Sequence, residues 1–145
     1  AKILAETLKN NGFKIYSGGT DTHLMLVDLR PFNVKGNLAS ESLCRANITC
    51  NKNGIPFDTE KPMITSGIRL GSQAATTRGF GLKEFEKVGE LITKVIKGLS
   101  ENPDDNSKVE NEVRNEVVSL CSSFPIYKNL NKWFALYVKK ERPLW

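Results

Sequence analysis

Arg69 is the residue whose type and position point most directly to chemistry. It lies inside the apolar run from Ile64 to Leu70, with Gly67 and Gly71 on either side. A guanidinium on a buried strand needs an anion, because an unpaired charge inside a protein is very costly. Its planar fork binds a carboxylate through two hydrogen bonds, and the glycines would let a ligand approach the backbone closely. The pattern therefore predicts either a carboxylate-binding arginine or a structural pair with an Asp or Glu elsewhere.

Three other polar features indicate chemistry less specifically. The segment 17–20 (Ser-Gly-Gly-Thr) resembles a phosphate-binding loop, but its spacing is wrong and no helix follows. A tight connection between strands is the favoured interpretation. His23 is an acid or base candidate, although a hydrogen-bonded structural histidine is the more common case at the start of an apolar strand. Asn47, Asn51 and Asn53 indicate either turns or amide recognition of a polar heterocycle.

The composition describes an ordinary globular domain of 145 residues with a net charge of +5. That charge is too small to imply nucleic-acid binding by itself. The longest apolar run, 24–27, is far shorter than the roughly 20 residues of a membrane span. The three cysteines, Cys44, Cys50 and Cys121, have no C-x-x-C spacing and predict packing positions in a reducing compartment. With no targeting segment in the sequence, we expect a cytoplasmic protein without a metal site.

Hydrophobic periodicity predicts strands early in the chain and two long helices late. Segment 51–64 is rich in Asn, Gly and Pro and is expected to be a long, functional loop. This order, without regular strand–helix alternation, predicts an α+β fold in which helices cover a small, mainly antiparallel sheet. Helices are expected at 1–10, 40–45, 82–99 and 107–122, and strands at 13–16, 23–29, 47–50 and 66–71.

The two long helices each carry an apolar stripe that predicts a core face. Asn106 or Ser107 is expected to cap the second of them. The chain begins inside a helical pattern without an initiator Met, which we interpret as a fragment of a longer protein. The stripes consist of Leu82, Phe85, Val88, Leu91, Ile92, Val95 and Leu99 in the first helix, and of Val109, Val113, Val117, Leu120 and Phe124 in the second.

An ordered set of motifs over residues 1–127 resembles the C-terminal small domain of serine hydroxymethyltransferase. This family has the aspartate-aminotransferase fold (fold type I) and uses pyridoxal phosphate to interconvert serine and glycine, with tetrahydrofolate as the one-carbon acceptor. The resemblance implies a homodimer in the complete enzyme. The motifs are YSGGTDTH at 16–23, VDLR at 27–30, RANITCNKN at 45–53, IP at 55–56, TSGIRLG at 65–71 and TRGF at 77–80.

The resemblance also implies roles for individual residues. Arg69 matches the arginine that holds the carboxylate of the substrate amino acid. Asn53 matches an asparagine that contacts the folate pterin, and the stretch Lys61, Pro62 and Met63 matches a loop assigned to folate binding. Neither His23 nor Arg78 is given a catalytic role by this match; we interpret both as structural.

This sequence departs from the family in several places. Met63 replaces a common Phe, and Gly71-Ser72-Gln73-Ala74 replaces Gly-Thr-Pro-Ala, which puts the local loop shape in doubt. The Schiff-base lysine, which follows a Thr-Thr-His run in the family, is missing, because His23 is followed by Leu24. We therefore expect this fragment alone to be inactive and not to bind pyridoxal phosphate stably. Residues 128–145, beyond the match, are expected to form a helical or irregular tail.

Two functions remain open at this point. The chain completes an active site whose lysine lies in the large domain of the same enzyme, or it is a truncated, non-catalytic paralogue that binds an acidic partner or RNA. The retained substrate-facing residues favour the first. Binding to RNA would weaken steeply with salt.

Overall fold

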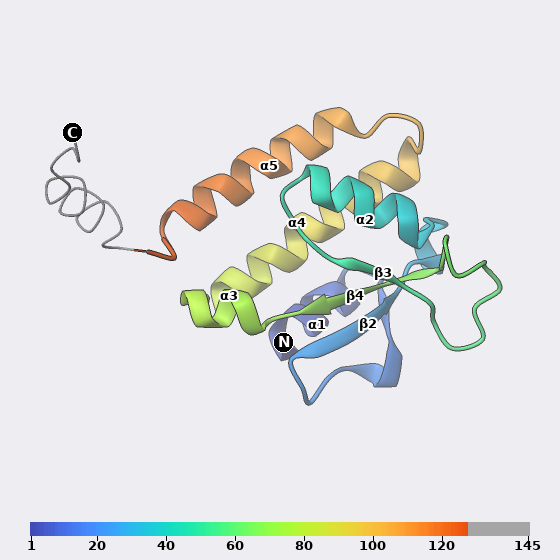
Figure 1. The fold of residues 1–145 in the computed structure, drawn as a ribbon, viewed down its shortest axis with the longest axis horizontal. Helices are drawn as coiled ribbons and strands as arrows, with labels where there is room; N and C mark the ends of the chain where they lie inside the picture. The colour runs from blue at the N-terminus through green and yellow to red at the C-terminus, as the bar shows by residue number, and fades with distance from the viewer. Residues whose placement is uncertain (128–145) are drawn as a thin grey trace, which may run out of the picture.

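The computed structural model describes residues 1–127. As predicted, the fold is α+β, with a four-stranded antiparallel sheet and helices packed against it (Figure 1). The helices are α1 (Lys2–Asn10), α2 (Gly36–Arg45), α3 (Gln73–Arg78), α4 (Leu82–Glu101) and α5 (Ser107–Ser122). The strands are β1 (Lys14–Ile15), β2 (Leu24–Asp28), β3 (Asn51–Asn53) and β4 (Gly67–Gly71), with short 3-10 turns at Tyr16–Gly18 and Arg30–Phe32.

The sheet has the order β1-β2-β4-β3, and every pair is antiparallel. The β1–β2 hairpin predicted from the sequence is confirmed. In the register of the sheet, Arg69 of β4 stands opposite Leu26 of β2 on one side and Asn51 of β3 on the other. The sheet thus brings residues from two other segments of the chain, one in central strand β2 and one in edge strand β3, beside Arg69.

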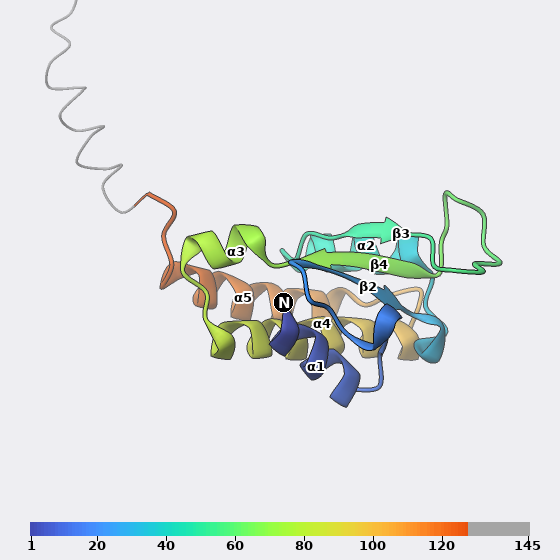
Figure 2. The ribbon, with the colours of Figure 1, turned by 90° about the horizontal axis from the view of Figure 1, so that it is seen from below.

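Alternation along β4 separates the core from the open face of the sheet. Ile68 and Leu70 are buried among the core side chains, whereas Arg69 between them is exposed. Successive side chains of a strand point to opposite faces, so Arg69 must face away from the core. Figure 2 shows the corresponding layers, with the sheet on one side and α1, α4 and α5 on the other.

The stripe predicted for α4 forms much of the core, with one exception. Phe85, Leu91, Ile92 and Val95 are all buried, whereas Leu82 is 73% exposed. Leu82 is the first residue of the helix, and its side chain extends beyond the end of the packed face. No helix within residues 1–127 is long and apolar enough to cross a membrane.

Several element boundaries differ from the prediction. The strand expected at 47–50 lies at β3 instead, because α2 ends at Arg45 and Asn47 adopts a left-handed φ of 63°. Because of that turn, the extended segment begins at Asn51 instead of at residue 47. Helix α2 begins earlier than expected, at Gly36, and α3 was not predicted because its six residues carry no apolar stripe.

Asn106 caps α5 by position but not through its side chain. Its amide instead donates to Ser42 Oγ (3.1 Å) and to the carbonyl of Val95 (3.0 Å). Ser42 Oγ in turn donates to Glu110 Oε1 (2.6 Å), and Arg45 donates to both oxygens of Glu110 at 2.7 Å. A polar network therefore joins α2 to α4 and α5 inside the domain.

Gly67 provides space for protein packing, which corrects the expectation that it makes room for a ligand. A Cβ built on Gly67 would lie 2.5 Å from Ile55 Cγ2, 2.7 Å from the Val27 carbonyl oxygen and 3.0 Å from that of Asn53. Two of these neighbours are backbone atoms of the adjacent strands, which cannot move independently. The glycine is therefore required by the sheet itself.

We expect Gly67→Ala to lower the free energy of unfolding by about 1–3 kcal/mol, as overpacking of a core typically does. Gly19→Ala is the matched control, since a Cβ at Gly19 would meet no atom within 4 Å. Urea unfolding followed by circular dichroism measures both variants. Equal stability of the two variants would contradict the packing argument.

Candidate functional site

A hollow of about 470 Å³ lies on the open face of the sheet beside Arg69. Its walls come from the β1–β2 connection, from β2 itself, from β3 and β4, and from the start of the loop 54–66, which joins β3 to β4. Tyr16, Thr22 and Pro56 were not expected in this site from their residue types, although each belongs to one of the family motifs. The lining residues are Tyr16, Ser17, Gly19, Thr20, Asp21, Thr22, Leu24, Met25, Leu26, Asn53, Pro56 and Arg69.

Arg69 is not a buried charge, and that premise of the sequence analysis is wrong. Its side chain is exposed because the apolar run around it faces the core only at alternate positions. One guanidinium nitrogen, Nη2, donates to Asn51 Oδ1 at 3.2 Å. Within residues 1–127 no carboxylate forms an ion pair with Arg69. The structural pair considered as an alternative is therefore not seen there, and the fork is open toward the hollow.

Asn53 lies with Arg69 in the lining of the hollow. Its side-chain nitrogen donates to the carbonyl of Gly54 at 2.7 Å, which turns the amide toward the start of the loop 54–66. Asn51 and Asn53 are two residues apart on β3, so their side chains share one face of the sheet. The structure thus brings an amide and a guanidinium from separate motifs to one cavity.

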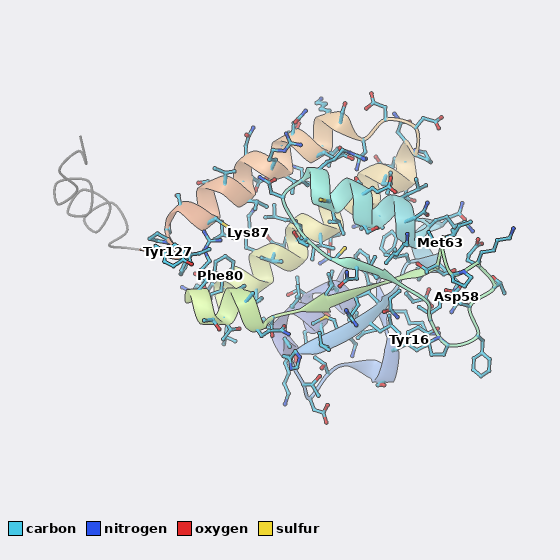
Figure 3. All side chains as sticks on the ribbon, in the orientation of Figure 1. Tyr16, Asp58, Met63, Phe80, Lys87 and Tyr127 are labelled. Atoms are coloured by element: carbon cyan, nitrogen blue, oxygen red, sulfur yellow. The ribbon has the colours of Figure 1, made fainter. Side chains whose placement is uncertain are left out.

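Lys61, Pro62 and Met63 do not line this hollow. They lie farther along the loop 54–66 and are exposed, with Met63 at 73%. Figure 3 shows Met63 at the same end of the molecule as Asp58 and Tyr16. Of the five residues assigned by resemblance, the structure therefore gathers two in the hollow and leaves three on the neighbouring loop.

The loop 54–66 is organised by Asp58, which the sequence analysis did not identify. Its carboxylate accepts hydrogen bonds from the amides of Ile55 (3.2 Å), Glu60 (3.0 Å) and Ser66 (2.9 Å), and from Ser66 Oγ (2.7 Å). Burial alone would raise the pKa of Asp58, but these hydrogen bonds outweigh it and hold the pKa well below its usual value. The ionised carboxylate therefore closes the loop on itself.

The segment 17–20 lies in the connection from β1 to β2, as the favoured interpretation predicted, although this connection runs over residues 16–23 and is not tight. Ser17, Gly19 and Thr20 also line the hollow, which was not predicted. Its turn places Ser17 at a left-handed φ of 63°. The side chain of His23 is exposed, and its carbonyl accepts the amide of Ser72 at 2.9 Å. Arg78 donates to the carbonyls of Cys121 (3.0 Å) and Phe124, and so fixes the end of α5.

A second, larger hollow of about 800 Å³ lies between α3, α4 and α5. Its lining is mostly apolar and includes Phe80, Val88, Val117 and Leu120. Figure 3 shows Phe80 at the opposite end of the molecule from Asp58. None of the residues assigned a substrate or folate role lies in this hollow.

All three cysteines are free thiols in the structure. Cys50 and Cys121 pack at the edge of the core, whereas Cys44 is exposed, which corrects the expectation of packing there. Burial raises the pKa of Cys50 to about 12, so it is a poor nucleophile. Within the described part of the chain, no group of His, Cys, Asp and Glu side chains is arranged to hold a metal ion.

The lining of the Arg69 hollow determines which groups fit there. Arg69 is its single cation, and the lining contains no lysine, so these residues do not fit a covalently attached pyridoxal phosphate. They do fit a carboxylate beside Arg69, with Ser17 and Thr22 in the same lining. The lining thus combines one cation, Arg69, with one carboxylate, Asp21, and several hydroxyl groups.

Comparison with known proteins identifies the family of the chain. The serine hydroxymethyltransferase family matches residues 1–92. The chain is 88% identical over 130 residues to a serine hydroxymethyltransferase of Pelagibacter ubique. The aligned stretch covers 90% of this chain and 30% of that protein. It is 63% identical to the enzyme of Marinomonas sp. and 62% identical to that of Paramagnetospirillum magneticum, each over 88% of this chain and 30% of the relative. The chain thus spans about 30% of the length of these relatives. It belongs to the serine hydroxymethyltransferase family.

Proposed function

We propose that residues 1–127 act as the C-terminal small domain of a cytoplasmic serine hydroxymethyltransferase and supply the substrate-carboxylate arginine and part of the tetrahydrofolate site. The observation that carries the proposal is the fork of Arg69. It faces a hollow shared with Asn53 and has no carboxylate partner within residues 1–127. An open guanidinium in a concave polar site is suited to bidentate binding of an amino-acid carboxylate.

The proposed role of Arg69 is to orient the substrate amino acid. Two parallel hydrogen bonds to the carboxylate would fix the substrate and so orient the bonds at its Cα. Pyridoxal phosphate, when bound, supplies the electron sink for the chemistry at that carbon. The hydrogen bond from Arg69 to Asn51 Oδ1 (3.2 Å) uses one end of the fork and holds the guanidinium over the sheet.

Asn53 is the proposed folate contact inside the hollow, and its amide can recognise the polar edge of a pterin. Lys61, Pro62 and Met63 are the proposed folate contacts on the loop 54–66 and would meet the ligand outside the hollow. The proposal thus places tetrahydrofolate across the opening between β3 and this loop. The Asp58 hydrogen bonds give the loop the fixed shape that such a contact needs.

The chain alone is expected to be inactive, because the lining of the hollow contains no lysine to attach the cofactor. The large domain of the same enzyme is the proposed source of that lysine, and the proposed assembly is a homodimer that converts serine and glycine with tetrahydrofolate. Residues 128–145, assigned to a tail in the sequence analysis, lie outside the described residues.

A chimaera tests this function. The 130-residue stretch of the Pelagibacter ubique relative that matches this chain, at 88% identity, is replaced by the sequence of this chain. We expect the chimaera to convert serine to glycine with tetrahydrofolate at a rate within about threefold of the relative's, whereas this chain alone shows no turnover. A folded chimaera without activity would contradict the proposal.

A further inference from the structure

Arg30 forms a polar network behind one wall of the Arg69 hollow. Its Nε lies 3.0 and 3.1 Å from the two carboxylate oxygens of Asp28, and its Nη2 lies 2.6 Å from Oδ2. Asp28 is only 1% exposed and also accepts the backbone amide of Arg30 at 3.0 Å. The guanidinium is therefore anchored on a buried carboxylate at the end of β2, and Arg30 itself does not line the hollow.

The same guanidinium reaches a residue that does line the hollow. Arg30 Nη2 donates to the hydroxyl oxygen of Tyr16 at 3.0 Å, and this hydroxyl donates to the carbonyl of Pro56 at 3.4 Å. On the ring of Tyr16, Lys14 Nζ lies 5.5 Å from the centroid, a cation–π distance. Tyr16 is thus held at its hydroxyl and at its ring, and its hydroxyl already has a donor and an acceptor partner.

Pro56 belongs to the opposite wall of the hollow. Among the hydrogen bonds of residues 1–127, the one between Tyr16 and Pro56 is the direct link between the β1–β2 connection and the loop 54–66. Asp58 closes this loop on itself, from Ile55 to Ser66, but forms no hydrogen bond to the β1–β2 connection. The Tyr16 hydroxyl therefore supplies the direct hydrogen bond between these two walls.

We propose that Arg30 is a positioning residue, which uses its ion pair with Asp28 to hold the Tyr16 hydroxyl against Pro56 and so sets the width of the hollow beside Arg69. Its role in catalysis rests on the function proposed above; its role in the shape of the hollow does not. The guanidinium bonds to Asp28 through Nε and Nη2 while Nη2 also reaches Tyr16. A lysine at this position has one nitrogen in place of these two and cannot reproduce the full set of bonds.

Hydrogen exchange in the 145-residue chain tests the positioning role without any ligand. Tyr16→Phe removes the hydroxyl and leaves the Asp28–Arg30 pair intact, so the fold is preserved. We expect the hydrogen-bonded amides of Ile55, Asp58 and Glu60 to exchange about fivefold faster, the factor that corresponds to the loss of one ordinary hydrogen bond. Arg30→Lys is expected to have the same effect. Tyr127→Phe, an exposed tyrosine at the other end of the molecule (Figure 3), is the matched control.

Unchanged exchange at Ile55, Asp58 and Glu60 in Tyr16→Phe would overturn the proposal. In the chimaera, both Tyr16→Phe and Arg30→Lys are expected to raise the KM for serine or tetrahydrofolate severalfold with little change in kcat, as expected when a binding wall is misplaced. Faster exchange with unaltered KM in an active chimaera would overturn the catalytic part of the role. An inactive wild-type chimaera contradicts the proposed function alone, and the exchange experiment still decides whether Arg30 positions the wall.

Discussion

Arg69→Lys in the chimaera is expected to lower kcat/KM for serine by about 100-fold or more, the effect of losing a charge-assisted hydrogen bond and its geometry. Lysine keeps the positive charge but presents a single ammonium in place of the planar fork. The carboxylate would then be attracted but no longer oriented. Arg69→Ala, which also removes the charge, is expected to lower kcat/KM by a further tenfold or so. Steady-state kinetics with serine and tetrahydrofolate measures both variants.

A conservative substitution elsewhere separates this effect from general damage. Arg114→Lys is the matched control, since Arg114 is a half-buried arginine on α5 that bonds to the carbonyl of Arg45 and lies outside the hollow. We expect it to keep normal kinetics. Near-normal serine turnover in Arg69→Lys or Arg69→Ala would remove Arg69 from the role proposed for it.

Arg45→Met is expected to lower the free energy of unfolding by about 2–4 kcal/mol at pH 7, because removing one partner of an ion pair leaves the other charge unpaired in the interior. Glu110 is 4% exposed and receives both of its charged hydrogen bonds from Arg45. Without them only Ser42 Oγ remains as a partner. Because the Arg45 side chain is itself 53% exposed, the loss is smaller than for a pair buried at both ends.

Surface ion pairs provide the comparison for this variant. Lys94→Met removes the pairs of Lys94 with Glu112 and Glu116 between α4 and α5, whose side chains are all well exposed. Such pairs are worth about 1 kcal/mol or less. Urea unfolding of both variants tests the difference, and an equal loss in the two would contradict the role of Glu110 as a buried charge.

The pH dependence of Arg45→Met follows from the pKa of Glu110. Hydrogen bonds from Arg45 lower this pKa below 4.5 and outweigh the opposing effect of burial. A lowered folded pKa adds stability above the unfolded value, and this stability is lost as the pH falls through the folded pKa. The deficit of Arg45→Met relative to the wild type should therefore shrink between pH 7 and pH 3. A deficit that stays constant over this range would show that ionisation of Glu110 is not its cause.

The sequence was sufficient to predict the α+β class, the β1–β2 hairpin and the two long helices. These features depend on local periodicity, and the stripe through Phe85, Ile92 and Val95 is regular enough to specify a buried helix face. Edge strand β3 was misplaced because a single left-handed residue, Asn47, moved the start of the extended segment. Residue type alone does not determine whether an asparagine adopts that conformation.

The ordered motifs also determined the family, since they depend only on residue identity and order. The surroundings of Arg69 were decided by the tertiary structure. An apolar strand with alternating faces can be covered on one side or on both, and the helices that cover only one side of β4 come from distant segments of the chain. Long-range packing, which local sequence patterns do not encode, produces three features of the site. These are the exposure of Arg69, the hollow that it shares with Asn53 and Tyr16, and the Arg30 network behind that wall.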